Sequence, residues 1–220
     1  MKDQFFTLGA PSTGYFMDKG SKFHAYAFPL EDEAQAAVHM QQVKKLHPKA
    51  RHYCTALRLH PDASLERSSD DGEPSGSAGR PILGQLLKYN LTNVYLIVVR
   101  YFGGTKLGIP GLIEAYKSSA QDALSKASIT ERQVYGLVKM KLSYETYPVF
   151  NNQLKHQGIL ILEETFDETI SLMIGFRKSM LMESLLDLLH QFSRMDFATV
   201  SAYAEHLGME IEILDDVVIR

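Results

Sequence analysis

The sequence predicts an α+β protein of two domains, on three observations. Apolar runs with the two-residue period of strands alternate with runs of helical period along the 220 residues. The apolar fraction of 45% is ordinary for a chain with packed cores. Near residue 130 the hydrophobic register and the charge balance both change: residues 1–130 hold 15 Lys and Arg against 12 Asp and Glu, and residues 131–220 hold 8 against 14. We expect one domain over each range, and the more basic first domain is the one expected to meet a polyanion.

The first domain opens with an expected β-hairpin, because strand patterns over residues 13–17 and 21–28 flank an Asp-Lys-Gly turn. Three acids at residues 31–33 suit the first turn of a helix that ends before Pro48. Alternation over residues 51–59 then predicts a strand with two distinct faces.

A polar connection and three further elements complete this domain. Residues 61–79 are nearly free of apolar side chains and predict a loop, of a length for which function or disorder is the usual reason. Pro81 and Pro110 each suit the first turn of a helix. Between these helices, residues 93–102 predict a fully buried strand.

The second domain is expected to follow the order β-α-β-β-α-β, which is ferredoxin-like. The patterns predict strands over residues 134–142, 159–165 and 169–175, helices over 144–157 and 179–193, and further strands over 198–204 and 209–214.

A glycine-rich turn after the buried strand is the first candidate site. Gly103 and Gly104 allow positive φ and close backbone approach, and a helix begins just beyond them. Arg100, Thr105 and Lys106 add donors for an anion. The run is not a Walker loop, because a leucine follows the lysine. The alternative is a tight connection in which the glycines serve only geometry.

The polar segment over residues 70–81 is the second candidate. Glu73, Ser75 and Arg80 offer oxygen ligands and an anion donor for a ligand or partner. The acids do not alternate as a calcium loop requires. A solvated connector is the alternative that composition favours.

Two weaker signals lie nearby. His52 and Cys54 share a strand face, which is compatible with a thiol activated by the imidazole; a small buried cysteine is the alternative that is favoured. Lys19 and Lys22 are nucleic-acid-binding candidates. They belong to a basic cluster interleaved with aromatic residues, whose other members are Lys44, Lys45, Lys49 and Arg51. Helix-dipole stabilisation explains Lys44 and Lys45 equally well.

Several classes are excluded or disfavoured. No apolar run reaches the roughly 18 residues of a membrane span, so no membrane partner is expected. Cys54 is the only cysteine, which rules out an intrachain disulfide and fits a reducing, cytoplasmic compartment. We expect no catalytic residue, metal or cofactor from these patterns.

Four motifs resemble the IMPACT family, in its bacterial YigZ-like branch. They cover residues 19–23 (KGSKF), 52–54 (HYC), 71–81 (DGEPSGSAGRP) and 99–108 (VRYFGGTKLG). The resemblance implies an N-terminal α/β sandwich with a left-handed βαβ crossover, similar to the fourth domain of elongation factor G. It also implies a C-terminal domain similar to the fifth domain of that factor.

The resemblance further implies a link to translation or stress regulation. The leading hypothesis is therefore a non-enzymatic, cytosolic binding protein that contacts RNA, the ribosome or a translation-associated protein through its N-terminal domain. The alternative is an enzyme that acts on a phosphorylated or nucleotide substrate at the two candidate segments. There, Arg80, Arg100 and Lys106 would hold the phosphate, and Glu73 would serve as a base or metal ligand.

Overall fold

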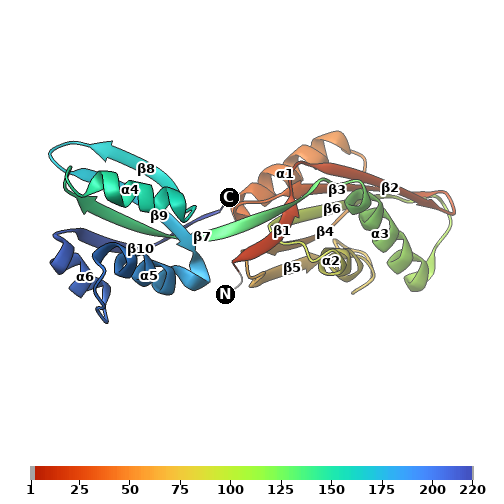
Figure 1. Ribbon diagram of the computed structural model, residues 1–220. Helices are drawn as coiled ribbons and strands as arrows, with labels where there is room; N and C mark the ends of the chain where they lie inside the picture. The colour runs from red at the N-terminus through yellow and green to blue at the C-terminus, as the bar shows by residue number, and fades with distance from the viewer. Residues whose placement is uncertain (1–2, 220) are drawn as a thin grey trace. The chain divides into compact units, whose positions relative to one another are not determined.

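The computed structural model describes residues 3–219, which form two compact units (Figure 1). One unit comprises Gln4–Arg132, and the other comprises Asp3 and the chain from Gln133 onward. Each unit has its own hydrophobic core. The mixed α and β composition agrees with the predicted class, and the two units are described separately below.

The first unit is built on an antiparallel sheet with the strand order β2-β3-β6-β4-β5. Its strands are β2 (Ser12–Asp18), β3 (Ser21–Pro29), β4 (His52–Leu59), β5 (Leu65–Ser69) and β6 (Val94–Tyr101). The strand β6 is central and, until its last residue, fully buried, as its continuous apolar sequence predicts. The predicted hairpin is confirmed: Lys19 and Gly20 form its turn with φ values of 44° and 79°.

Helices cover both faces of this sheet. The helices α2 (Gly79–Lys88) and α3 (Gly108–Ser125) pack on one face, against alternate residues of β3, β4 and β6. The helix α1 (Glu33–Leu46) packs on the other face, which carries the remaining set of alternate residues. Since β3 and β4 both run antiparallel to β6, they are parallel to each other, and α1 connects them in a βαβ crossover. The left-handed sense of that crossover stays a prediction.

Two strands of this unit escaped the sequence patterns. The strand β5 lies inside the segment predicted as a loop, so that part of the prediction was wrong. Its LERSS sequence is mostly exposed at the sheet edge, where backbone pairing to β4 rather than apolar alternation defines the strand. The strand β1 (Gln4–Leu8) bridges to the chain after α2, through Phe6 and Leu91.

The second unit carries an antiparallel sheet in the order β10-β7-β9-β8. Its elements are β7 (Ile129–Leu142), α4 (Tyr147–His156), β8 (Leu160–Phe166), β9 (Ile170–Arg177), a 3₁₀ turn (Lys178–Met180), α5 (Leu181–Ser193), α6 (Val200–Leu207) and β10 (Glu210–Ile219).

The strand predicted over residues 198–204 was wrong, because a helix occupies most of that range. Thr199 caps α6 by accepting the Ala202 N–H, and Tyr203 inserts into the core from the same helix. The remaining order agrees with the predicted β-α-β-β-α-β arrangement, to which α6 is an addition.

Candidate functional site

A hollow of about 750 Å³ opens where β6 ends, and we call it the basic hollow. Three segments line it: the α1–β4 connection, the polar loop before α2, and the turn from β6 into α3. The lining residues are Lys49, Arg51, His52, Glu73, Pro74, Arg100, Tyr101, Phe102, Lys106, Leu107, Gly108, Ile109 and Leu112. Four of these side chains are Lys or Arg and one is a carboxylate.

Arg100 lies in the wall of this hollow and is only 8% exposed. The sheet register places it between Phe23 and His52, on the face that α2 and α3 cover. Its guanidinium carbon lies 5.7 Å from the ring centre of Phe23 and 5.6 Å from that of Phe102. Its Nε is buried and has no hydrogen-bond partner among the described residues.

Glu73 neutralises Arg100 inside the unit. Its Oε1 accepts from Arg100 Nη1 at 2.6 Å and from the Tyr116 hydroxyl at 2.9 Å. Burial, the neighbouring Cys54 and Glu73 itself all raise the pKa of Tyr116, which therefore stays protonated and donates to the carboxylate. Because the charge of this carboxylate is balanced by Arg100, it does not balance the other cations of the hollow.

The remaining cations of the basic hollow are available to a ligand. Lys49, Arg51 and Lys106 are exposed, and none of them makes an ion pair or hydrogen bond within the described part of the chain. Beside them, Phe102 and Ile109 present exposed apolar surface. The hollow therefore combines free positive charge with an apolar wall.

Asp70 organises the polar loop. Its Oδ1 accepts from the N–H groups of Ala78 and Gly79 at 3.0 and 2.8 Å, and its Oδ2 accepts from Gly76 at 2.8 Å. Burial raises the pKa of Asp70, but these three N–H donors, together with Arg80, outweigh it and hold the pKa below its ordinary value. One carboxylate thus ties the loop to the start of α2 and positions Glu73 between them.

Cys54 is the small, buried strand residue that the sequence favours, and no hydrogen bond joins it to His52 among the described residues. The His52 Nδ1 bonds to the carbonyl of Asp71 at 2.9 Å, and the Cys54 thiol donates to the carbonyl of Asp70 at 3.0 Å. Burial, reinforced by nearby acids, raises the pKa of Cys54 to about 12, although a hydrogen bond with Tyr116 opposes the shift. The thiol is therefore protonated and supports the loop from the sheet.

The glycine turn is explained first by packing. The Gly103 N–H donates to Ser21 Oγ at 3.1 Å, and a Cβ at Gly103 would lie 1.9 Å from the carbonyl carbon of Gly20. Only a residue without a side chain permits this approach of the turn to the β2–β3 hairpin. Gly104, with a φ of 89°, faces open space.

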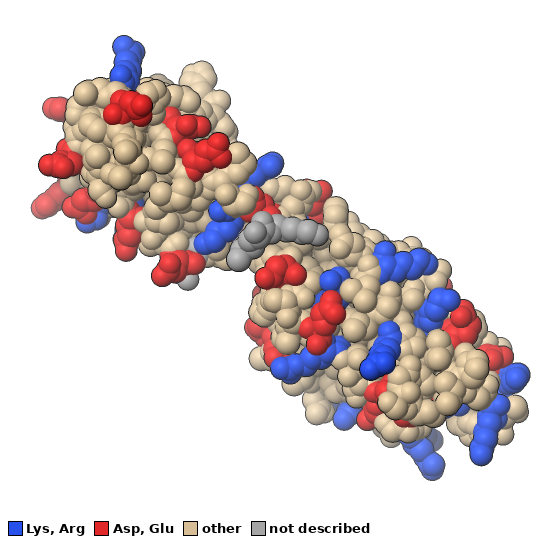
Figure 2. All heavy atoms as spheres, turned by 90° about the horizontal axis from the view of Figure 1, so that it is seen from below, with Lys and Arg blue, Asp and Glu red and all other residues tan. Residues whose placement is uncertain are grey.

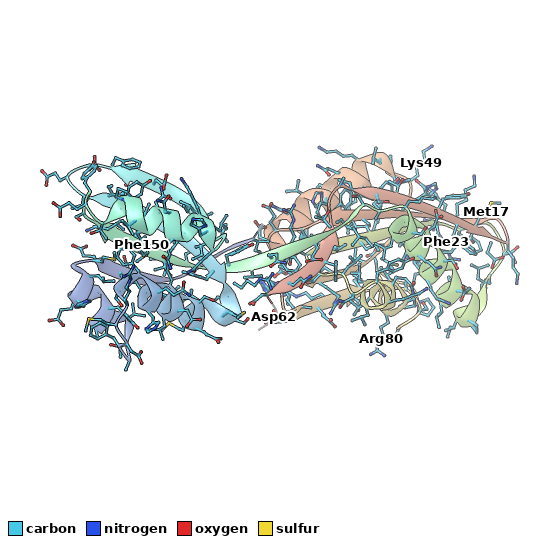
Figure 3. The ribbon with its side chains drawn as sticks, in the orientation of Figure 1. Met17, Phe23, Lys49, Asp62, Arg80 and Phe150 are labelled. Atoms are coloured by element: carbon cyan, nitrogen blue, oxygen red, sulfur yellow. The ribbon has the colours of Figure 1, made fainter. Side chains whose placement is uncertain are left out.

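The hollow brings together some of the residues that the sequence singled out and not others. It is lined by Glu73, Arg100 and Lys106. The adjoining turn, which does not line it, is formed by Gly103, Gly104 and Thr105, and two further candidates are exposed outside it, Ser75 and Arg80. Of the two lysine candidates, Lys22 lines a second hollow and Lys19 lies in the hairpin turn. Figure 3 shows Arg80 pointing outward, away from Lys49.

Sequence reasoning missed the aromatic and apolar contributors, chiefly Phe102, Ile109 and Tyr116. Tyr116 carries ordinary core spacing on its helix, so nothing local marks its hydroxyl as a partner of Glu73. A large aromatic directly before two glycines was the available signal for Phe102.

Comparison with known proteins finds a family match over the part of the chain that contains the basic hollow. The model of the Impact N-terminal domain matches residues 19–124. The chain is 31% identical over 170 residues to IMPACT family member YvyE of Bacillus subtilis, with 77% of this chain and 78% of that protein covered. The chain belongs to the IMPACT family.

Other relatives within the IMPACT family agree. IMPACT family member YigZ of Escherichia coli is 37% identical over 126 residues, covering 56% of this chain and 61% of that protein. The Protein IMPACT homolog of Saccharomyces cerevisiae is 34% identical over 116 residues, covering 50% and 43%. A crystal structure of a hypothetical protein superposes with a TM-score of 0.65 at 24% identity over 98% of this chain and 100% of that one, which shows the shared fold.

Two further observations bear on the class of protein. Within residues 3–219, no cluster of three or more His, Cys, Asp or Glu side chains is arranged to hold a metal ion. None of the described helices has the length and apolar character needed to cross a membrane.

Proposed function

We propose that this IMPACT-family protein is a regulatory binding protein associated with translation, and that its N-terminal unit contacts RNA through the basic hollow. The link to translation comes from the family resemblance. The observation that carries RNA contact is the set of exposed, unpaired cations, Lys49, Arg51 and Lys106, around a buried arginine whose carboxylate partner is internal.

The distribution of charge supports the same proposal. Figure 2 shows Asp and Glu gathered over the unit that begins at residue 133, and more Lys and Arg over the unit of residues 4–132. A polyanion therefore meets a favourable potential at the first unit and repulsion at the second. Exposed apolar side chains beside the cations favour RNA, whose bases stack on such surfaces, over an acidic peptide.

The enzymatic alternative is less well supported. A phosphate-substrate enzyme at the same segments needs Glu73 as a base, but both the Arg100 guanidinium and the Tyr116 hydroxyl engage its Oε1. Arg80, the third proposed phosphate ligand, is exposed outside the basic hollow. A screen of phosphatase and nucleotidase substrates tests this alternative, and turnover that Glu73→Gln abolishes would favour it.

The direct test is binding of ribosomes and of fluorescent RNA over a series of salt concentrations. Replacing Lys49, Arg51 or Lys106 with Gln should weaken binding and lower the slope of log affinity against log salt by about 1 for each phosphate that the variant no longer neutralises. Lys126→Gln, which removes an equal charge from the C-terminal end of α3, is the matched control and should change little. Absence of RNA and ribosome binding at low salt overturns the proposal, as does equal binding of poly-glutamate, which would indicate a protein partner.

A further inference from the structure

A second hollow, of about 460 Å³, lies next to the basic hollow in the same unit. We call it the aromatic hollow. It is lined by Gly20, Lys22, His24, His47, Tyr101 and Phe102. These residues come from the β2–β3 hairpin, the C-terminal end of α1 and the end of β6.

Tyr101 and Phe102 line both hollows. Phe102 is 59% exposed, although it follows a strand that is otherwise buried. Its ring is supported by the Arg100 guanidinium 5.6 Å away, on the side of the basic hollow. Phe102 therefore lies between the basic hollow and the aromatic hollow.

Ring side chains form the wall of the aromatic hollow. The ring centres of His24 and His47 are 5.0 Å apart, and each lies within 6.0 Å of the Tyr101 ring. Hydrogen bonds fix His47 at both nitrogens, to the Tyr26 hydroxyl at 2.5 Å and to the Tyr101 hydroxyl at 3.1 Å. The rings are thus held in place before any ligand arrives.

The electrostatics of the two hollows differ. Burial lowers the pKa of His24 and of His47. The positive charge of Lys22 lowers the pKa of His24 further, and the neighbouring His24 lowers that of His47 further. Both imidazoles are therefore neutral at pH 7, and Lys22 is the one lysine or arginine among the lining residues. The aromatic hollow suits a flat, uncharged ring, whereas the basic hollow suits a phosphate.

We propose that the two hollows form one track for single-stranded RNA, in which phosphate groups bind the basic hollow and an unpaired base enters the aromatic hollow across Phe102. This inference rests on the proposed function and specifies its ligand. A base in a duplex is stacked on both faces and paired along one edge, so it cannot lie against Phe102 without leaving the helix. The track therefore requires single-stranded RNA longer than one nucleotide.

The test is fluorescence anisotropy with single-stranded and double-stranded RNA of the same sequence, and with competitors of one to six nucleotides. We expect tighter binding of the single strand and a sharp gain in competition between one nucleotide and two or three. Phe102→Ala should weaken single-strand binding roughly 10-fold, the scale of removing one base stack, with an unchanged salt slope. Phe102→Tyr should restore most of the affinity.

Two controls separate this inference from the proposed function. Phe166→Ala removes a similarly exposed phenylalanine from the other unit and should leave binding unchanged. Circular dichroism of Phe102→Ala checks folding, and Lys22→Gln should independently weaken single-strand binding. If Phe102→Ala and Lys22→Gln bind RNA normally while the variants of Lys49, Arg51 and Lys106 do not, the track is overturned and the proposed function stands. Equal affinity for single and double strands also overturns the track.

Discussion

At the scale of single residues, Asp70 holds the polar loop of the candidate site in place although it lies outside the basic hollow. Three backbone N–H groups, one in the polar loop and two at the start of α2, donate to its two oxygens. The carboxylate is charged in the folded protein because those donors outweigh the cost of burial. This one group therefore anchors the loop that carries Glu73, the ion-pair partner of Arg100.

Asp70 should make stability depend on pH. Because its folded pKa lies below the ordinary 3.8, its contribution is complete above about pH 5 and is lost as pH falls through the folded pKa. Asp70→Asn keeps one acceptor oxygen and should lower the free energy of unfolding at pH 7 by about 2 kcal/mol. The variant should also lose part of the acid-induced drop in stability that the parent protein shows. Urea unfolding between pH 3 and pH 7 measures both effects.

The control for this prediction is Asp62→Asn. Asp62 lies in the same connection, but it is exposed and its hydrogen bonds are confined to its own turn, at Ser64. Its replacement should change stability much less. Equal losses in the two variants would contradict the organising role given to Asp70.

At the scale of elements, the turn after β6 is locked to the turn of the β2–β3 hairpin. Gly103 lies against Gly20 so closely that there is no room for a methyl group, and its N–H donates to Ser21. The same approach fixes where the chain turns away from the sheet, and therefore where Phe102 and Lys106 stand.

Gly103→Ala should be strongly destabilising, by about 3 kcal/mol or more, because the clash is with backbone that cannot rotate away. Gly104→Ala should cost roughly 1–2 kcal/mol, since only its positive φ opposes a side chain. Thermal or urea unfolding of both variants measures the difference. A larger loss for Gly104→Ala would show that the packing against Gly20 does not govern the turn.

The elements that the sequence revealed are those with a local signature. The Asp-Lys-Gly turn predicts the β2–β3 hairpin, and continuous apolar residues predict β6. The exposed edge strand β5 lacks that signature, because its partner supplies the hydrogen bonds. The helix α6 was mistaken for a strand because a short apolar run fits either period.

The sequence predicted several polar residues of the candidate site but not the contacts between them. Motif reading singled out Glu73, Arg100 and Lys106 before their positions were known. Nothing local predicts that Glu73 would bond to an arginine 27 residues away, because that bond is made only when the loop folds over the sheet end. The same reason hides the ring cluster of His24, His47 and Tyr101, which three separate elements bring together.

At the scale of the whole molecule, the hydrophobic clusters of the two units share no buried residue, which indicates two folding units. The clusters of the first unit lie on both faces of the sheet centred on β6, and the cluster of the second lies between the sheet of β7–β10 and its helices. Leu185 of α5 is fully buried in the second core, and Leu96 of β6 is fully buried in the first.

Leu185→Ala should therefore destabilise the second unit by about 2–5 kcal/mol and leave the first unaffected. Amide hydrogen exchange measures this: protection should fall in β7 and β9 and stay unchanged in β6. Leu96→Ala is the reciprocal control and should reverse the pattern. Loss of protection in both units from either variant would show that the chain unfolds as one cooperative unit.

The central position of β6 also has a consequence for biosynthesis. Its neighbours β3 and β4 both precede it in the chain, so neither has its main partner until residue 101 has been made. At roughly 5–20 residues per second, synthesis to that point takes about 5–20 s. Until then β3 can pair only with β2, and β4 only with β5, so the edge of each strand that faces β6 stays unpaired. We therefore expect the fraction of chains with a correctly folded N-terminal unit to depend on the rate of translation and on chaperones that bind unpaired strands.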